Sequence, residues 1–177
     1  MDTLDILFAI GRTLLIGTIG LFIAHKGRKF NLNVFNLFGR INRLNFSITY
    51  IGLMIIFYML ISFYHTMLDV IVTLPAYWGL RIFIGLCQAI LFPFLCTVLS
   101  RRLHDLNIGS LPAMVWSFFI IFTYTYTALF STAIIFNIVL ILVALILMIL
   151  PGQDKPNQYG PPTKRARKSR KTELRKN

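Results

Sequence analysis

The sequence predicts an all-α fold, a polytopic membrane helix bundle. Of its 177 residues, 56% are hydrophobic, which exceeds the roughly 45–50% of soluble domains. Sixteen of the eighteen Lys and Arg residues lie in three polar segments, His25–Arg43, Ser100–Asn107 and Gln153–Asn177, and long apolar runs separate these segments. Because Lys and Arg are enriched in the cytoplasmic loops of membrane proteins, we expect all three polar segments on the cytoplasmic side.

The first apolar run, Leu4–Ala24, is expected to be a retained membrane anchor. Asp2 and Asp5 precede the main part of the run and Lys26 follows it, which reverses the charge order of a secretory signal. We therefore expect the N-terminus outside. Arg12 lies within the run, so either it faces other helices or the segment lies flat in the interface. The first arrangement gives five transmembrane helices, and the second gives four.

Two further crossings are expected over Leu44–Tyr64 and Tyr77–Leu99, each long enough for a hydrocarbon core of about 30 Å. The loop between them, His65–Ala76, contains no Lys or Arg, which favours the outer face. Arg81 lies about one turn inside the second of these crossings. We expect its guanidinium to reach towards the interface while its stem stays among apolar groups.

The stretch Leu111–Leu150 contains no Asp, Glu, Lys or Arg. A single helix of this length would be roughly 60 Å long, about twice the thickness of the hydrocarbon core. We expect two crossings in a tight hairpin that bends near Thr123–Thr132, where hydroxyl side chains interrupt the aliphatic run. One crossing followed by a re-entrant segment is the alternative. With five crossings or with four, the C-terminus is expected in the cytoplasm.

Three regions are expected along the chain, with no internal repeat or flexible linker between folded domains. Residues 1–34 form an N-terminal transmembrane segment and a basic loop, and residues 35–162 form the main membrane domain. Residues 163–177 form a basic, disordered cytoplasmic tail. The net charge is +12. Since the basic residues flank apolar runs, the expected partner is anionic phospholipid and not nucleic acid.

Groups of residues typical of catalysis are scarce. The sequence contains no phosphate-binding glycine loop, no serine-hydrolase motif and no zinc-protease motif. Cys87 and Cys96 lie on one expected helix, roughly 13 Å apart along its axis, which is too far for a disulfide. His65 and Asp69 offer only two ligands for a metal. We therefore predict no catalytic residue, no metal site and no cofactor.

Polar residues at the cytoplasmic ends of the expected helices form the candidate site. The topology brings them to one membrane face, where Arg can hold a phosphate through paired N–H donors. We expect Asp105 to pair with a nearby arginine. The alternative is that these arginines only fix the orientation of the chain. The candidate residues for binding a head group or a partner are Arg40, Arg43, Arg101, Arg102, His104, Asp105, Asn157 and Tyr159.

Three motifs carry a resemblance to a known family. FGRINRLNF at Phe38–Phe46, LSRRLHDLNIGS at Leu99–Ser110 and PGQDKPNQYGPP at Pro151–Pro162 resemble the signatures of the domain of unknown function 805 family. The resemblance extends roughly from Phe35 to Pro162. It implies a small protein of the bacterial inner membrane. That family has no established activity, so the resemblance implies location and fold and not mechanism.

Two hypotheses for the function follow. The first is a non-enzymatic accessory or scaffold module whose cytoplasmic face binds lipid head groups, a membrane or cytoplasmic protein, or a second copy of the chain. The second is a lipid-processing or lipid-translocating protein in which Arg101 and Arg102 hold a phosphate and His104 transfers a proton. The first is favoured, because catalysis usually needs a nucleophile or a metal beside such a base.

Overall fold

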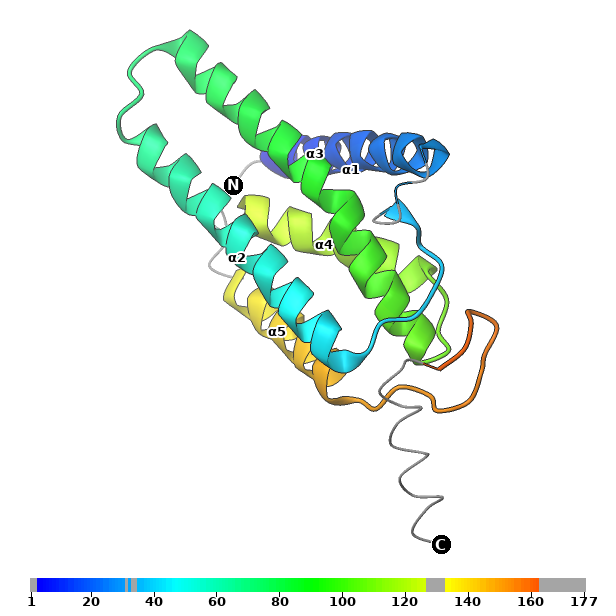
Figure 1. The fold of residues 1–177 in the computed structure, drawn as a ribbon. Coiled ribbons are helices and arrows are strands. Elements are labelled where there is room, and N and C mark those ends of the chain that lie inside the picture. Colours follow the sequence, from blue (N-terminus) through cyan, green and yellow to red (C-terminus); the bar gives the residue numbers. More distant parts are fainter. Residues whose placement is uncertain (1–2, 31, 33–34, 127–132, 163–177) are drawn as a thin grey trace, which may run out of the picture.

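The computed structural model describes residues 3–30, 32, 35–126 and 133–162. Within these residues the chain forms five α-helices and no β-strand (Figure 1). In chain order they are α1 (Thr3–Lys29), α2 (Arg43–Leu68), α3 (Leu74–Asp105), α4 (Leu111–Tyr126) and α5 (Ala133–Ile149). The all-α class predicted from the sequence is confirmed. The tail over 163–177 and most of the bend expected near Thr123–Thr132 lie outside the described residues.

Helices α2 and α3 are long and apolar enough to cross a membrane. They contain 26 and 32 residues, or about 39 Å and 48 Å at about 1.5 Å per residue. The two helices run antiparallel to each other (Figure 1). Helices α4 and α5 are also apolar but shorter, with 16 and 17 residues. They occupy the stretch for which the sequence predicts a hairpin.

Helix α3 continues beyond the crossing expected to end at Leu99. It runs through Asp105, so the motif RRLHD lies on its last turns and not in a loop after it. The physical reason is that neither Gly nor Pro occurs between Leu99 and Asp105, and an apolar crossing can extend into polar residues where no residue breaks the helix.

Asn107 ends helix α3. Its φ of 63° is in the left-handed region. The Asn107 N–H donates to the His104 carbonyl over 3.1 Å, and the Ile108 N–H donates to the Leu103 carbonyl over 2.8 Å. These two bonds satisfy carbonyls that the helix end would otherwise leave without a partner. The chain thus turns sharply directly after the polar end of α3.

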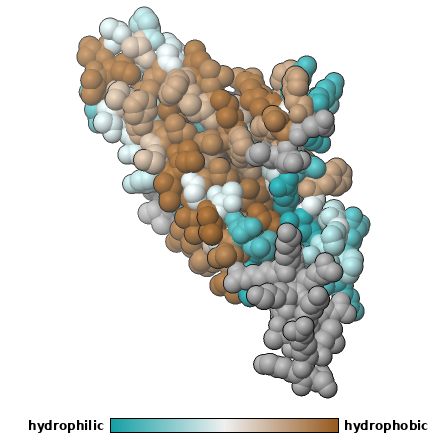
Figure 2. All heavy atoms as spheres, in the orientation of Figure 1, coloured by the Kyte–Doolittle hydropathy of each residue, from teal (hydrophilic) through white to brown (hydrophobic). Residues whose placement is uncertain are grey.

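The outer faces of the helices are strongly apolar. Figure 2 shows hydrophobic side chains over most of the visible face, with hydrophilic ones gathered where α1 ends, α2 begins and α3 ends. Exposed side chains along the long helices include Ile48, Ile55, Tyr58, Ile82 and Ile90. Soluble monomers rarely expose apolar patches larger than a few hundred Å². The surface is therefore compatible with a membrane protein.

Helix α1 runs across the middle of α3 (Figure 1). Pro93 within α3 has no N–H, so the carbonyl of Ala89, four residues earlier, loses its usual helical partner. Gly20 of α1 lies against this carbonyl. A Cβ atom at Gly20 would stand 2.9 Å from the Ala89 oxygen and 2.8 Å from the Phe92 ring. The absence of a side chain at Gly20 therefore allows α1 and α3 to approach closely.

Replacing Gly20 with Ala is expected to lower the thermal stability of the purified protein. The added methyl group meets backbone as well as a ring, and such overpacking costs about 1–3 kcal/mol. Gly52→Ala in α2 is the matched control, since a Cβ there would meet no atom within 4 Å. Thermal melts followed by circular dichroism provide the measurement. Equal melting temperatures for both variants would contradict the close approach of α1 and α3.

Candidate functional site

Three segments that are far apart in the sequence meet at the end of α3. The linker before α2, residues 35–42, runs alongside α3 towards its C-terminal end. The segment after α5, residues 150–162, returns to the same end of α3 (Figure 1). Backbone hydrogen bonds join all three: the Ile41 N–H donates to the Arg101 carbonyl over 3.3 Å, and the Gln153 N–H donates to the Asp105 carbonyl over 2.9 Å. The three sequence motifs therefore converge in one site.

The centre of this site is the carboxylate of Asp105, held between two arginines. One carboxylate oxygen, Oδ1, lies 2.8 Å from Arg40 and the other, Oδ2, lies 2.7 Å from Arg102. The side chains of Arg40 and Asp105 are each 2% exposed, and that of Arg102 is fully buried. The expected pairing of Asp105 is confirmed. We call these three residues the Arg–Asp clamp.

The clamp arginines use further donors to hold the chain around α5. Arg102 donates through Nε to the Leu147 carbonyl over 2.7 Å and through Nη2 to the Leu150 carbonyl. Arg40 donates to the Lys155 carbonyl over 3.0 Å and also to that of Gln153. Carbonyls at a helix C-terminus carry partial negative charge, which favours a nearby cation. The clamp therefore joins α3 to the end of α5 and to the segment after it.

Gly152 is the point where the segment after α5 passes the clamp. A Cβ atom there would stand 1.8 Å from Asp105 Oδ2. The carboxylate could move aside only by leaving at least one of its arginines, so no side chain fits at Gly152 while the clamp is intact. The glycine thus allows the backbone to approach the buried charge.

His104 lies beside the clamp with its ring enclosed by protein. It is 1% exposed, and its ring stacks on that of Tyr159 with centroids 3.7 Å apart. Nδ1 lies 3.2 Å from the Gly39 carbonyl, and Nε2 lies 2.8 Å from Ser110 Oγ. The carbonyl can only accept, so Nδ1 carries the proton in this arrangement. Both ring nitrogens therefore have protein partners.

A tight turn delivers Tyr159 to the His104 ring. Asn157 and Gly160 exchange two backbone hydrogen bonds of 3.2 Å and 3.0 Å, and Gly160 has φ 129°, a conformation that favours glycine. The side-chain amide of Asn157 donates to the His104 carbonyl over 2.8 Å. Asn157 therefore fastens the turn to α3 while Tyr159 covers the imidazole.

The other two candidate arginines lie outside the clamp. Arg101 is half-buried, and its Nε donates to the Asn36 carbonyl over 3.0 Å. Arg43 is exposed, and its Nη1 donates to the Ile149 carbonyl over 3.5 Å, which makes a weak hydrogen bond. The geometry thus divides the predicted site into a buried set and a more accessible pair, Arg43 and Arg101.

Sequence reasoning missed the groups that complete the site. Ser100 and Ser110 are joined by a 2.8 Å hydrogen bond between hydroxyls, and both contact the imidazole of His104. Both serines lie within the second quoted motif, Leu99–Ser110, which was a usable signal. Gly152 lies within the third quoted motif, Pro151–Pro162, which was a signal of the same kind. The backbone carbonyls gave no signal, because any residue can supply a carbonyl acceptor.

The chemistry of the site is that of a structural ion-pair network. Within the described residues, no group of three or more His, Cys, Asp or Glu side chains is placed to hold a metal ion. A carboxylate with charge-assisted bonds to two guanidinium groups is strongly held. Removing one member of such a buried network leaves an uncompensated charge, which is costly.

The comparisons with known proteins identify one relationship. A family model described as "Protein of unknown function (DUF805)" matches residues 34–161. The match spans more than two thirds of the chain and includes the first two motifs and all but the last residue of the third. It agrees with the extent expected from the sequence, roughly Phe35 to Pro162. No match was found among the curated proteins or among the solved structures.

Replacing Asp105 with Asn is expected to destabilise the protein by about 3–5 kcal/mol, because Arg40 and Arg102 would be left buried with like charges. Asp154→Asn is the matched control, since Asp154 is exposed in the segment after α5. Denaturant or thermal unfolding in detergent measures the difference. If both variants unfold like the parent, the clamp does not hold the three segments together.

Proposed function

The chain belongs to the DUF805 family of proteins of unknown function, and we propose that it is a non-enzymatic protein of the bacterial inner membrane. The family and the geometry of the site are the basis of this proposal. It acts as an accessory or scaffold module whose cationic cytoplasmic face binds anionic lipid head groups or a protein partner. The apolar outer faces of the helices support the membrane location.

One observation carries the proposal: the motif residues best suited to chemistry are used in internal contacts. Arg40 and Arg102 donate to Asp105 and to backbone carbonyls. His104 is covered by Tyr159. The clamp therefore supports the fold, and binding at this face falls to the more accessible Arg43 and Arg101, which flank it. A surface built in this way attracts anionic head groups at the membrane boundary.

The alternative of a lipid-processing or lipid-translocating protein is less well supported. It requires Arg101 and Arg102 to hold a phosphate together and His104 to exchange a proton with a substrate. Arg102 is fully buried and His104 is 1% exposed. A substrate would reach this imidazole only after Tyr159 had left its stacked position.

We propose five crossings, with the N-terminus outside and the C-terminus in the cytoplasm. Arg12 lines a groove between α1 and α3, which supports the arrangement in which this charge faces another helix. Helix α1, with 27 residues, is about 40 Å long and has sufficient length to cross at a tilt. Four crossings follow if α1 instead lies in the interface.

A reporter that is active only in the cytoplasm, fused after Asn177, is expected to give a signal. The nine Lys and Arg residues beyond Leu150 disfavour export of this segment. The same reporter fused after Val72, in the loop between α2 and α3, should be silent. A silent fusion at Asn177 or an active one at Val72 would overturn the proposed topology, and a fusion before Met1 distinguishes five crossings from four.

Replacing Arg43 and Arg101 together with Gln is expected to weaken the binding of anionic phospholipid at the cytoplasmic face by roughly tenfold or more, because hydrogen bonds to charged groups contribute about 1.5–3 kcal/mol each. The matched control replaces Arg28 and Lys29 with Gln. It removes the same charge from the exposed end of α1. Mass spectrometry of bound lipid provides the measurement, and equal lipid loss in the two double variants would contradict a specific role for Arg43 and Arg101.

A further inference from the structure

A groove between α1 and α3 contains Arg12 and Arg81, which the site at the end of α3 does not use. Its volume is about 600 Å³, which falls in the range of about 300–1,000 Å³ typical of ligand pockets. Apolar side chains from both helices line most of it, among them Leu15, Ile16, Ile19, Ile82 and Leu86. We call this cavity the α1–α3 groove.

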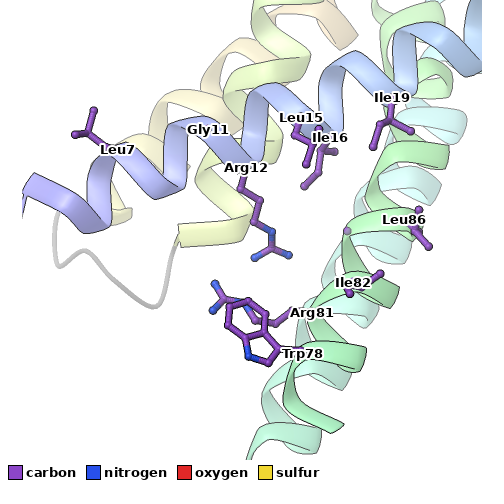
Figure 3. Close-up of a pocket in the computed structure, with 11 residues that line it drawn as sticks. Leu7, Gly11, Arg12, Leu15, Ile16, Ile19, Trp78, Arg81, Ile82 and Leu86 are labelled. Atoms are coloured by element: carbon purple, nitrogen blue, oxygen red, sulfur yellow. The ribbon is translucent and has the colours of Figure 1, made fainter. Parts of the chain in front are cut away.

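Arg12 and Arg81 meet across this groove. Figure 3 shows Arg12 extending from α1 and Arg81 from α3, with their guanidinium groups pointing towards each other and Trp78 beside them. This geometry follows from the crossing of the two helices, which touch where Gly20 meets Ala89. Arg12 lies eight residues before Gly20 on α1, and Arg81 lies eight residues before Ala89 on α3. They therefore lie at equal distances along the two helices from the point where the helices touch.

Neighbouring aromatic residues hold Arg81 in place. Its Nη1 donates to the Tyr77 hydroxyl over 2.7 Å, and its guanidinium carbon lies 5.3 Å and 5.6 Å from the ring centroids of Tyr77 and Trp78. A guanidinium on an aromatic face is favourably placed and keeps its plane fixed. The groove thus presents an oriented cation on α3 opposite a second cation on α1.

The position of Arg81 along α3 corresponds to head-group depth. Arg81 and Arg102 are 21 residues apart on one continuous helix, or about 32 Å at about 1.5 Å per residue. This distance matches the hydrocarbon core of about 30 Å. When Arg102 lies at one membrane boundary, Arg81 therefore lies at the other. Tyr77 and Trp78 then occupy the level that amphipathic aromatic rings prefer.

The remaining lining of the groove suits a hydrocarbon chain. Ile82 and Leu86 follow Arg81 along α3, and Leu15 and Ile19 follow Arg12 along α1. These four apolar residues thus lie between the charges and the helix contact at Gly20. A ligand that fits must have a negative group at one end and an apolar chain at the other.

From this charge, depth and lining we propose that the α1–α3 groove binds an anionic phospholipid of the leaflet opposite the Arg–Asp clamp. The phosphate lies between Arg12 and Arg81, which can each donate two parallel N–H bonds to its oxygens. One acyl chain follows the apolar part of the groove towards the helix contact. The proposal concerns the end of α3 opposite Arg43 and Arg101.

The test measures binding of phosphatidylglycerol to the full chain in detergent by native mass spectrometry. Phosphatidylcholine with the same acyl chains is the reference lipid. The parent protein is expected to retain phosphatidylglycerol in preference to phosphatidylcholine. Replacing Arg12 and Arg81 together with Gln should weaken retention by roughly tenfold or more, since charge-assisted contacts are lost. Replacing Arg43 and Arg101 with Gln should remove a different bound phosphatidylglycerol, so the losses should add when all four arginines are replaced.

A second variant blocks the groove and keeps both arginines. Gly85 lines the groove, and a Cβ there would meet no atom within 4 Å, so Gly85→Leu is expected to fold and to occupy the space of the acyl chain. It should also reduce phosphatidylglycerol retention, because the acyl chain loses the space that it would fill. Gly52→Leu in α2, where a Cβ likewise meets no atom within 4 Å, is the control and should bind like the parent.

Three results would overturn the proposal. The first is parental retention of phosphatidylglycerol by the variant that lacks Arg12 and Arg81. The second is parental retention by Gly85→Leu. The third is a dimer of the chain that Gly85→Leu dissociates, because the groove would then hold a second copy and not a lipid. If only the Arg43 and Arg101 variant loses lipid, the groove does not bind phosphatidylglycerol. That result would instead support lipid binding at the cytoplasmic face, as in the proposed function.

Discussion

The fold depends on one buried carboxylate that pairs with two buried guanidinium groups. Asp105 bonds Arg40 from the linker before α2 and Arg102 from α3. One negative charge for two positive ones would leave an excess, but Arg102 also donates to carbonyls at the C-terminal end of α5. The partial negative charge of that helix end supplies the remaining compensation. The clamp thus forms only when α3, α5 and the linker are in place together.

This requirement explains the backbone features around the clamp. Gly152 brings the segment after α5 past the carboxylate at a distance that excludes a side chain. The turn closed by Gly160 then carries Tyr159 onto His104. Because a partly satisfied polar network costs more than an apolar core, each of these contacts is needed for the others to be favourable. The motif residues therefore act first as a device that fixes three segments.

The sequence predicted the elements that depend on composition and missed those that depend on backbone geometry. Apolar runs located the helices, and charge partition placed the polar ends of α2 and α3 together. The pairing of Asp105 was predicted because an unpaired carboxylate is unfavourable beside an anionic membrane surface, whereas a pair with arginine is favourable. Burial of Arg102 and His104 was not predicted, since a short RRLHD stretch reads equally well as a surface loop. The burial of Arg102 depends on its hydrogen bonds to the backbone carbonyls of Leu147 and Leu150. Any residue can supply such a carbonyl, so the sequence gives no sign of it.

The continuity of α3 links the two arginine-rich ends of the molecule. Pro93 removes a hydrogen bond within this helix and leaves the Ala89 carbonyl for the approach of Gly20 on α1. The helices meet there and diverge on either side, so the contact decides where the α1–α3 groove begins. Arg12 and Arg81 face each other because they are equally far from that contact. Helix α3 thus contributes to the Arg–Asp clamp at its C-terminal end and to the cationic groove near its N-terminal end. Pro93 and Gly20 determine where that groove begins.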